Sequence, residues 1–175
     1  MFKIEYKIIY ENCLASDVYY DYYSETVDYF DAVDTVYGDI LITVNNSSYG
    51  YIFDKPVKTD REDIYGDTVI DVWFKNLLKA CIALNSVTEY SIREPECSDV
   101  FLRLNKNKLG DLSVSYISGG KTHWTEKISY EEFAGEVICK TQKLIDDLCE
   151  YNEEMEYSFV VSRLTDKLEE LKKDM

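Results

Sequence analysis

Residues 67–84 read DTVIDVWFKNLLKACIAL and place apolar side chains at the period of an α-helix. On a helical projection these side chains fill about half of the circumference, while charged residues spaced four apart hold the other face. The apolar set consists of Val69, Ile70, Trp73, Phe74, Leu77, Leu78, Ala80, Cys81 and Leu84. We expect Asp67 to cap the start of the helix and Asn85 to end it. A helix this apolar requires a sheet or other helices around it.

Strand patterns lie on both sides of this predicted helix. Residues 2–10 alternate apolar and polar side chains, and residues 37–45 and 48–54 flank a turn at 45–47, which predicts a β-hairpin. After the helix, four more strand patterns separated by polar turns predict an antiparallel meander. They are residues 88–94, 100–105, 112–117 and 122–128.

Two further helices are predicted toward the C-terminal end. Ser129 and Glu132 have the spacing of a capping box at the start of the apolar stripe in residues 130–151, and residues 157–173 carry a second stripe. Strands followed by a helix, then strands followed by helices, predict an α+β fold. We expect a single domain, residues 1–175, in which an antiparallel sheet of about six to seven strands packs against a central apolar helix and two C-terminal helices.

The charge of the chain is strongly acidic and unevenly distributed. The 175 residues include 19 Lys and Arg and 34 Asp and Glu, which gives a net charge of −15. Residues 1–66 carry a net charge of −8 and residues 129–175 carry −7, while residues 67–128 are neutral. Such a charge repels nucleic acids and anionic membranes and attracts basic proteins. The predicted partner is therefore a basic protein, with no direct binding of nucleic acid and no membrane association.

The sequence also predicts a cytoplasmic location. Residues 1–10 alternate in polarity, unlike a secretory signal peptide, and no stretch approaches the ~20 apolar residues of a membrane-spanning helix. The five cysteines are scattered and form no CxxC pair, which favours reduced thiols over disulfides.

Two features raise the question of catalysis, and neither has the context that a catalytic motif requires. Residues 118–122, SGGKT, imitate the end of a phosphate-binding loop, but position 115 is a serine where the pattern needs a glycine, and a strand pattern follows. We interpret this motif as a hairpin turn. His123 is the only histidine of the chain, so any mechanism with a histidine base would depend on it. Beside Trp124 in a strand pattern, it is typical of a packing residue.

No catalytic residue, metal ligand or cofactor-binding residue is predicted. A single histidine and dispersed thiols disfavour a zinc site, and the acidic clusters lack the alternating spacing of a calcium loop. With 34 acidic residues, a buried carboxylate pair that performs acid–base chemistry stays an open alternative. We expect no enzymatic activity and keep a small carboxylate-using enzyme as the alternative.

The acidic tyrosine-rich segment, residues 17–37, is the strongest candidate for binding. It reads DVYYDYYSETVDYFDAVDTVY, and no basic residue occurs between Lys7 and Lys55. Tyrosines provide large contact areas at a small cost in side-chain entropy, and the acids around them attract a basic surface. The predicted partner-binding residues are Asp17, Asp21, Tyr22, Tyr23, Glu25, Asp28 and Asp31. The pattern fits a helix, irregular strands or an ordered loop, and residues 150–156, EYNEEME, repeat the combination on a smaller scale.

Three stretches give the chain a resemblance to a known class of proteins. They are YGDILITVN at 37–45, YGYI at 49–52, and Trp73 within an apolar helix that is followed by strands and a capped helix. In this layout the chain resembles the small acidic immunity proteins of bacterial polymorphic toxin systems. The resemblance implies a cytosolic protein without catalytic activity that occludes a partner toxin.

The leading hypothesis is therefore a non-catalytic acidic binding module that neutralises a basic partner, as an immunity protein does for a toxin of the nuclease type. A second hypothesis is a nucleic-acid mimic that inhibits a DNA- or RNA-binding effector of the restriction or CRISPR type. In that case the acids should be spaced like the phosphates of a nucleic-acid strand.

Overall fold

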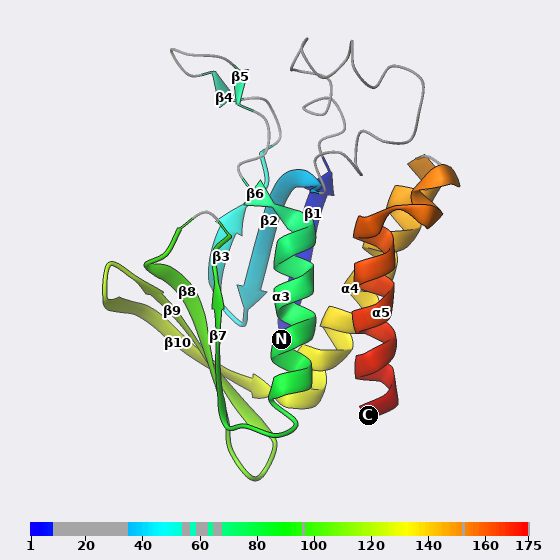
Figure 1. The fold of residues 1–175 in the computed structure, drawn as a ribbon. Helices are drawn as coiled ribbons and strands as arrows, with labels where there is room; N and C mark the ends of the chain where they lie inside the picture. The colour runs from blue at the N-terminus through cyan, green and yellow to red at the C-terminus, as the bar shows by residue number, and fades with distance from the viewer. Residues whose placement is uncertain are drawn as a thin grey trace.

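The computed structural model describes residues 1–8, 35–53, 57–58, 63–64, 68–95, 97–151 and 153–174. Within these residues the fold is α+β, as predicted: two four-stranded antiparallel sheets pack against three α-helices (Figure 1). The predicted strands are thus divided between two sheets. A separate pair of short strands, β4 (Val57–Lys58) and β5 (Asp63–Ile64), belongs to neither sheet.

The first sheet, called here the N-terminal sheet, is built around the predicted hairpin. Its strands are β1 (Phe2–Ile8), β2 (Tyr37–Val44), β3 (Ser47–Tyr51) and β6 (Thr68–Val69), and both β1 and β6 pair with β2. The hairpin turns tightly because Asn45 adopts a φ of 53°, a left-handed conformation that asparagine tolerates better than most residues.

The second sheet, called here the meander sheet, confirms the predicted run of four strands. These are β7 (Glu89–Arg93), β8 (Val100–Lys106), β9 (Asp111–Ser118) and β10 (Lys121–Ser129), which pair in chain order. The SGGKT motif forms the turn between β9 and β10, as expected. Its two glycines have φ values of 55° and 72°, the left-handed geometry of a two-residue hairpin turn.

A carboxylate on β10 joins the two sheets. Glu126 accepts hydrogen bonds from Asn45 Nδ2 at 3.0 Å and Ser47 Oγ at 2.9 Å, and these bonds lower the pKa of Glu126. Beside it, Trp124 Nε1 donates to the carbonyl oxygen of Ser48 at 3.1 Å. The hairpin end of the N-terminal sheet is therefore tied to the last strand of the meander sheet.

The helices are α3 (Ile70–Ala83), α4 (Tyr130–Tyr151) and α5 (Phe159–Asp174), with the short 3₁₀ helix η2 (Glu153–Tyr157) between the last two. Helix α3 lies centrally, in front of the N-terminal sheet in the view of Figure 1 and between the meander sheet and the pair α4 and α5. Its apolar face is buried, including Trp73, Phe74, Leu77, Leu78 and Cys81. No helix in the described part of the chain is long and apolar enough to cross a membrane.

The ends of α3 differ from the prediction. The helix begins at Ile70 rather than after Asp67, because Thr68 and Val69 pair with β2 as strand β6. The N-cap residue is Val69, which makes no side-chain capping bond, and the C-cap is Leu84 rather than Asn85. Pairing with a distant strand thus takes precedence over the local capping pattern.

Helix α4 covers the free edge of β1 with its carboxylates. Glu132 Oε1 accepts the backbone N–H of Phe2 at 2.7 Å, and Glu136 Oε1 accepts that of Ile4 at 2.9 Å. The capping box is confirmed in one half only: the backbone N–H of Glu132 donates to Ser129 Oγ at 3.1 Å, while the Glu132 carboxylate takes the strand as its partner.

Candidate functional site

The predicted partner-binding residues lie outside the described residues. They are Asp17, Asp21, Tyr22, Tyr23, Glu25, Asp28 and Asp31, all within residues 9–34. The smaller acidic and aromatic stretch, residues 150–156, lies largely within the described part of the chain. It occupies the junction of α4, η2 and α5, at the top of the two helices in Figure 1.

This junction exposes large aromatic side chains. Tyr151 is 53% exposed, Tyr157 82% and Phe159 67%. Exposed carboxylate side chains lie on the same short stretch, at Glu150, Glu153 and Glu156. These six residues, Glu150, Tyr151, Glu153, Glu156, Tyr157 and Phe159, are called here the acidic-aromatic corner. Single exposed apolar residues are common on protein surfaces, but three large ones on one short stretch make this junction the candidate interaction surface.

The corner is held in place from below by buried residues of the same stretch. Met155 and Ser158 are fully buried between the exposed aromatic positions. Ser158 Oγ accepts the backbone N–H of Val161 at 3.1 Å, which caps the start of α5. The buried residues fix the backbone that carries the exposed rings. This backbone therefore loses little conformational entropy when the rings bind a partner.

A groove between α4 and α5 adjoins the corner. It is an open groove that has three acidic side chains and no basic one among its described lining residues. These are Gln142, Ile145, Cys149, Glu153, Glu156, Val161, Ser162, Thr165 and Asp166. Burial and the carboxylates of Glu156 and Asp146 raise the pKa of the Cys149 thiol, which keeps it protonated and unsuited to nucleophilic attack.

His123 takes part in packing, as its sequence context indicates. Its ring stacks on that of Tyr116, with centroids 4.9 Å apart and planes inclined by 27°. The register of β10 against β9 shifts between Thr122 and Trp124, so a bulge places His123 beside this tyrosine. His123 is thus an exposed side chain on strand β10 that stacks on Tyr116.

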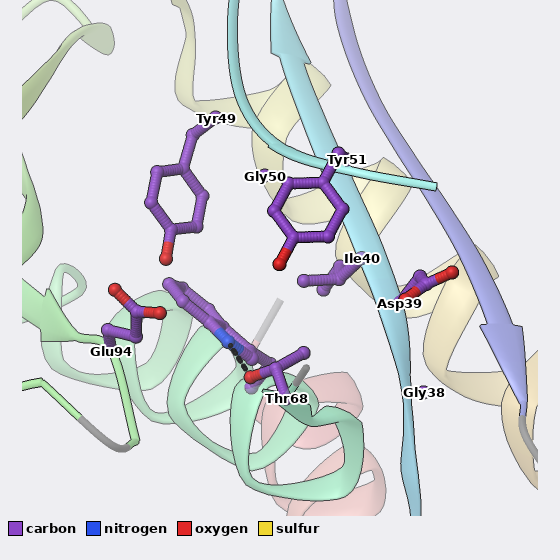
Figure 2. Close-up of a pocket in the computed structure, with 9 residues that line it drawn as sticks. Gly38, Asp39, Ile40, Tyr49, Gly50, Tyr51, Thr68 and Glu94 are labelled. Atoms are coloured by element: carbon purple, nitrogen blue, oxygen red, sulfur yellow. Dashed lines mark hydrogen bonds between the residues drawn. The ribbon is translucent and has the colours of Figure 1, made fainter. Parts of the chain in front are cut away.

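A second hollow, which the sequence did not predict, lies between β2, β3 and the start of α3 (Figure 2). It has a cavity volume of about 40 Å³ and is called here the tyrosine pocket. Its lining residues come from five separate parts of the chain: Gly38, Asp39, Ile40, Tyr49, Gly50, Tyr51, Thr68, Trp73 and Glu94. Tyr49 and Tyr51 could have been paired from their alternation on one strand, but no local signal links them to Glu94.

The floor and wall of the tyrosine pocket are fixed by internal contacts. Trp73 Nε1 donates to Thr68 Oγ1 at 2.9 Å, shown as the dashed line in Figure 2, and Trp73 is fully buried. The ring centroids of Tyr49 and Trp73 are 5.2 Å apart. Burial and the negative charge of Glu94 raise the pKa of the Tyr49 phenol, so this phenol is protonated and uncharged at neutral pH.

Asp39 lines the tyrosine pocket with its backbone, while its carboxylate lies on the opposite face of β2. Figure 2 shows Asp39 and Ile40 leaving the strand in opposite directions. The Asp39 side chain is buried, at 2% exposure, and Oδ2 accepts the backbone N–H of Phe53 at 3.0 Å. Lys7 Nζ donates to the carbonyl oxygen of the same Phe53, so strand β1 supports this contact.

Among the described residues, no group of three or more His, Cys, Asp or Glu side chains is arranged to hold a metal ion. No protein-family model, curated protein or solved structure matches the chain.

Proposed function

We propose that this protein is a non-catalytic acidic binding module that neutralises a basic protein partner, in the manner of an immunity protein directed against a nuclease-type toxin. The observation that carries the proposal is the acidic-aromatic corner, where three exposed aromatic side chains stand among exposed carboxylates. The net charge of −15 supports the same chemistry.

The two kinds of side chain in the corner have different parts in binding. Tyr157 and Phe159 offer large apolar areas that become buried in a complex, and such residues form the energetic centre of many interfaces. The carboxylates of Glu150, Glu153 and Glu156 attract a basic partner at a distance, which raises the association rate. A protein that occludes a nuclease in this way acts by covering its basic surface and requires no chemistry of its own.

The experiment begins by identifying a partner. The protein is used to capture partners from its native host, and candidates with a basic domain and nuclease activity are purified. The proposal expects the protein to inhibit that activity at a ratio of one to one. A captured partner that is acidic or whose activity is unaffected would contradict it.

The corner is then tested by paired substitutions. Tyr157→Ala should raise the dissociation rate by a factor that corresponds to about 2 kcal/mol, because a hot-spot ring is removed. Leu109→Ala is the matched control, since Leu109 is 89% exposed in the turn between β8 and β9, and it should bind as wild type. Equal dissociation rates for both variants would remove the corner from the interface.

A further inference from the structure

The tyrosine pocket has a chemical character that the proposed function does not explain. Its inward polar groups are the hydroxyls of Tyr49, Tyr51 and Thr68 and the carboxylate of Glu94, and none of its described lining residues is basic. Figure 2 shows both phenol hydroxyls and the Glu94 carboxylate turned toward the same space. The Tyr49 hydroxyl donates a hydrogen bond to the Glu94 carboxylate, which has further acceptor positions, and the phenol oxygens can themselves accept. The pocket therefore presents hydrogen-bond acceptors and one negative charge.

Among the described lining residues, Glu94 is the acidic side chain that faces into the pocket. Tyr49 stays uncharged because burial and the nearby carboxylate raise the pKa of its phenol. The carboxylate of Asp39 points away from the pocket on the other side of β2 (Figure 2). An entering group with one positive charge would thus be matched by one negative charge.

The walls favour an organic cation over a metal ion. Trp73 is fully buried beneath the pocket, so an entering group meets the ring of Tyr49 and the ring of Tyr51, which is 41% exposed. Aromatic faces attract ammonium groups through their quadrupole, and an ammonium carries three N–H donors and no acceptor. A hard divalent cation would require several carboxylate or carbonyl ligands, and this pocket offers one carboxylate.

We propose that the tyrosine pocket binds the ammonium group of a lysine side chain presented by the basic partner. In this assignment Glu94 pairs with the charge, the phenol oxygens accept its N–H groups, and the tyrosine rings surround its methylene stem. The compact head of a lysine suits a cavity of about 40 Å³ better than the broad guanidinium of an arginine, which binds best to a carboxylate through two parallel bonds. The identity of the donor as a protein lysine rests on the proposed function, whereas the pocket chemistry does not.

The test uses n-butylammonium, which represents the lysine side chain and requires no partner. The probe is added to ¹⁵N-labelled protein, and the two indole N–H resonances are followed by NMR. The resonance of Trp73, whose N–H donates to Thr68 beneath the pocket, should shift in a saturable way, and that of Trp124 should not. The variant Trp124→Phe assigns the two signals. Absence of a saturable shift would overturn the proposal.

Two substitutions of equal chemistry provide the decisive comparison. Glu94→Gln should weaken n-butylammonium binding by about tenfold or more, because it removes the carboxylate that faces the pocket among the described lining residues while keeping the shape of the side chain. Glu89→Gln removes the same charge from an exposed position on β7 and should leave the binding unchanged. Equal weakening by both variants would mean that only the overall charge attracts the probe, and would overturn the site.

Related probes separate lysine from other ligands. Neutral n-butanol should not shift the Trp73 signal, and tetramethylammonium, which has no N–H donor, should bind more weakly than n-butylammonium. Tighter binding of ethylguanidinium would overturn the assignment to lysine. A pocket that binds n-butylammonium in a protein that captures no basic partner would contradict the proposed function and leave the ammonium site standing.

Discussion

Asp71 is a buried carboxylate at the first turn of α3, at 3% exposure. Its Oδ1 accepts the backbone N–H of Val36 at 2.9 Å, and the backbone N–H of Ile70 donates to the carbonyl oxygen of Val36 at 2.9 Å. Both backbone polar groups of Val36, which precedes β2, are thus hydrogen-bonded to the first residues of α3. The carboxylate serves as an anchor for this segment, which its position in the i,i+4 charge pattern did not indicate.

The buried position of Asp71 predicts a pH effect of defined sign. Burial raises its pKa above the ordinary 3.8, although Val36, Lys75 and Arg163 oppose the shift. At pH values between 3.8 and the raised pKa, the folded state binds more protons at Asp71 than the unfolded state does. The contribution of Asp71 to the free energy of unfolding therefore falls as the pH rises through that window. The free energy of unfolding of wild type minus that of Asp71→Asn should therefore decrease with rising pH. Urea unfolding at several pH values measures it, and an increase would mean that the carboxylate is stabilised by its cations.

Leu77 tests the packing of α3 at a single position. It is fully buried in the middle of the helix, so Leu77→Ala should leave a cavity and lower the free energy of unfolding by about 2–5 kcal/mol. Lys79→Ala is the control on the same helix, because Lys79 is exposed, and should change stability by less than about 0.5 kcal/mol. Chemical denaturation measures both. Equal midpoints would show that the core lies elsewhere.

At the scale of elements, α4 protects the N-terminal sheet. An exposed edge strand offers unpaired backbone groups to other chains, and proteins cover such edges to prevent aggregation. Here two carboxylates one helical turn apart, Glu132 and Glu136, accept the N–H groups of alternate residues of β1. The hydroxyl of Tyr6 extends the contact by donating to Asp147 at 2.6 Å. The rise over four helical residues, about 6 Å, is close to the length of two strand residues, about 7 Å, so Glu132 and Glu136 match Phe2 and Ile4.

Glu136 provides the test of this cover. Glu136→Ala leaves the N–H of Ile4 without its acceptor and should cost about 1–3 kcal/mol, while Glu136→Gln keeps an acceptor oxygen and should cost less than about 1 kcal/mol. Glu131→Ala removes an exposed acid from the first turn of the same helix and serves as the control. Thermal unfolding and light scattering are the measurements. If the alanine and glutamine variants lose equal stability, the charge of Glu136 matters rather than its hydrogen bond.

At the scale of the whole molecule, the acidity is concentrated in the two ends of the chain. The meander sheet and α3 lie within the electrically neutral stretch, residues 67–128, whereas α4, η2 and α5 belong to a stretch of net charge −7. An uneven charge distribution of this kind produces a field that steers an oppositely charged protein toward the acidic residues. Such steering acts on the association rate and weakens with salt, because surface charges are screened.

This field predicts separate kinetic effects for acids and aromatics. Replacing Asp21, Glu25 and Asp28 together by Asn and Gln should slow association with the partner and flatten its salt dependence, with stability unchanged or slightly raised. Tyr22→Ala should instead weaken binding by about 2 kcal/mol, and this loss should appear as a faster dissociation rate. Binding kinetics at two salt concentrations test both. If the triple variant keeps the association rate and the salt dependence of wild type, the acidic residues of this segment contribute to solubility and not to binding.

Local patterns predicted the elements that depend on neighbouring residues. The turn at 118–122 follows from two successive glycines, which adopt left-handed angles without strain. The hairpin at 45–47 follows from Asn45, because asparagine tolerates the left-handed φ of 53° better than most residues. The inner face of α3 follows from its period, because a helix this apolar must turn that face to the core. Alternation also predicted the strands, since it records which face of each strand is buried.

The sequence alone thus determined the α+β class, the main strands, the helices α3, α4 and α5, and the charge of the molecule, because periodicity, turn chemistry and composition are properties of adjacent residues. Only the tertiary structure decided how the strands divide between two sheets, because alternation does not state which strands become neighbours. It also decided the start of α3, where Thr68 and Val69 pair with Tyr37 and Gly38 rather than join the helix. The tyrosine pocket was also decided by the tertiary structure. Tyr51 and Glu94 line the same pocket only after the chain has folded, and no local signal in the sequence links residues so far apart.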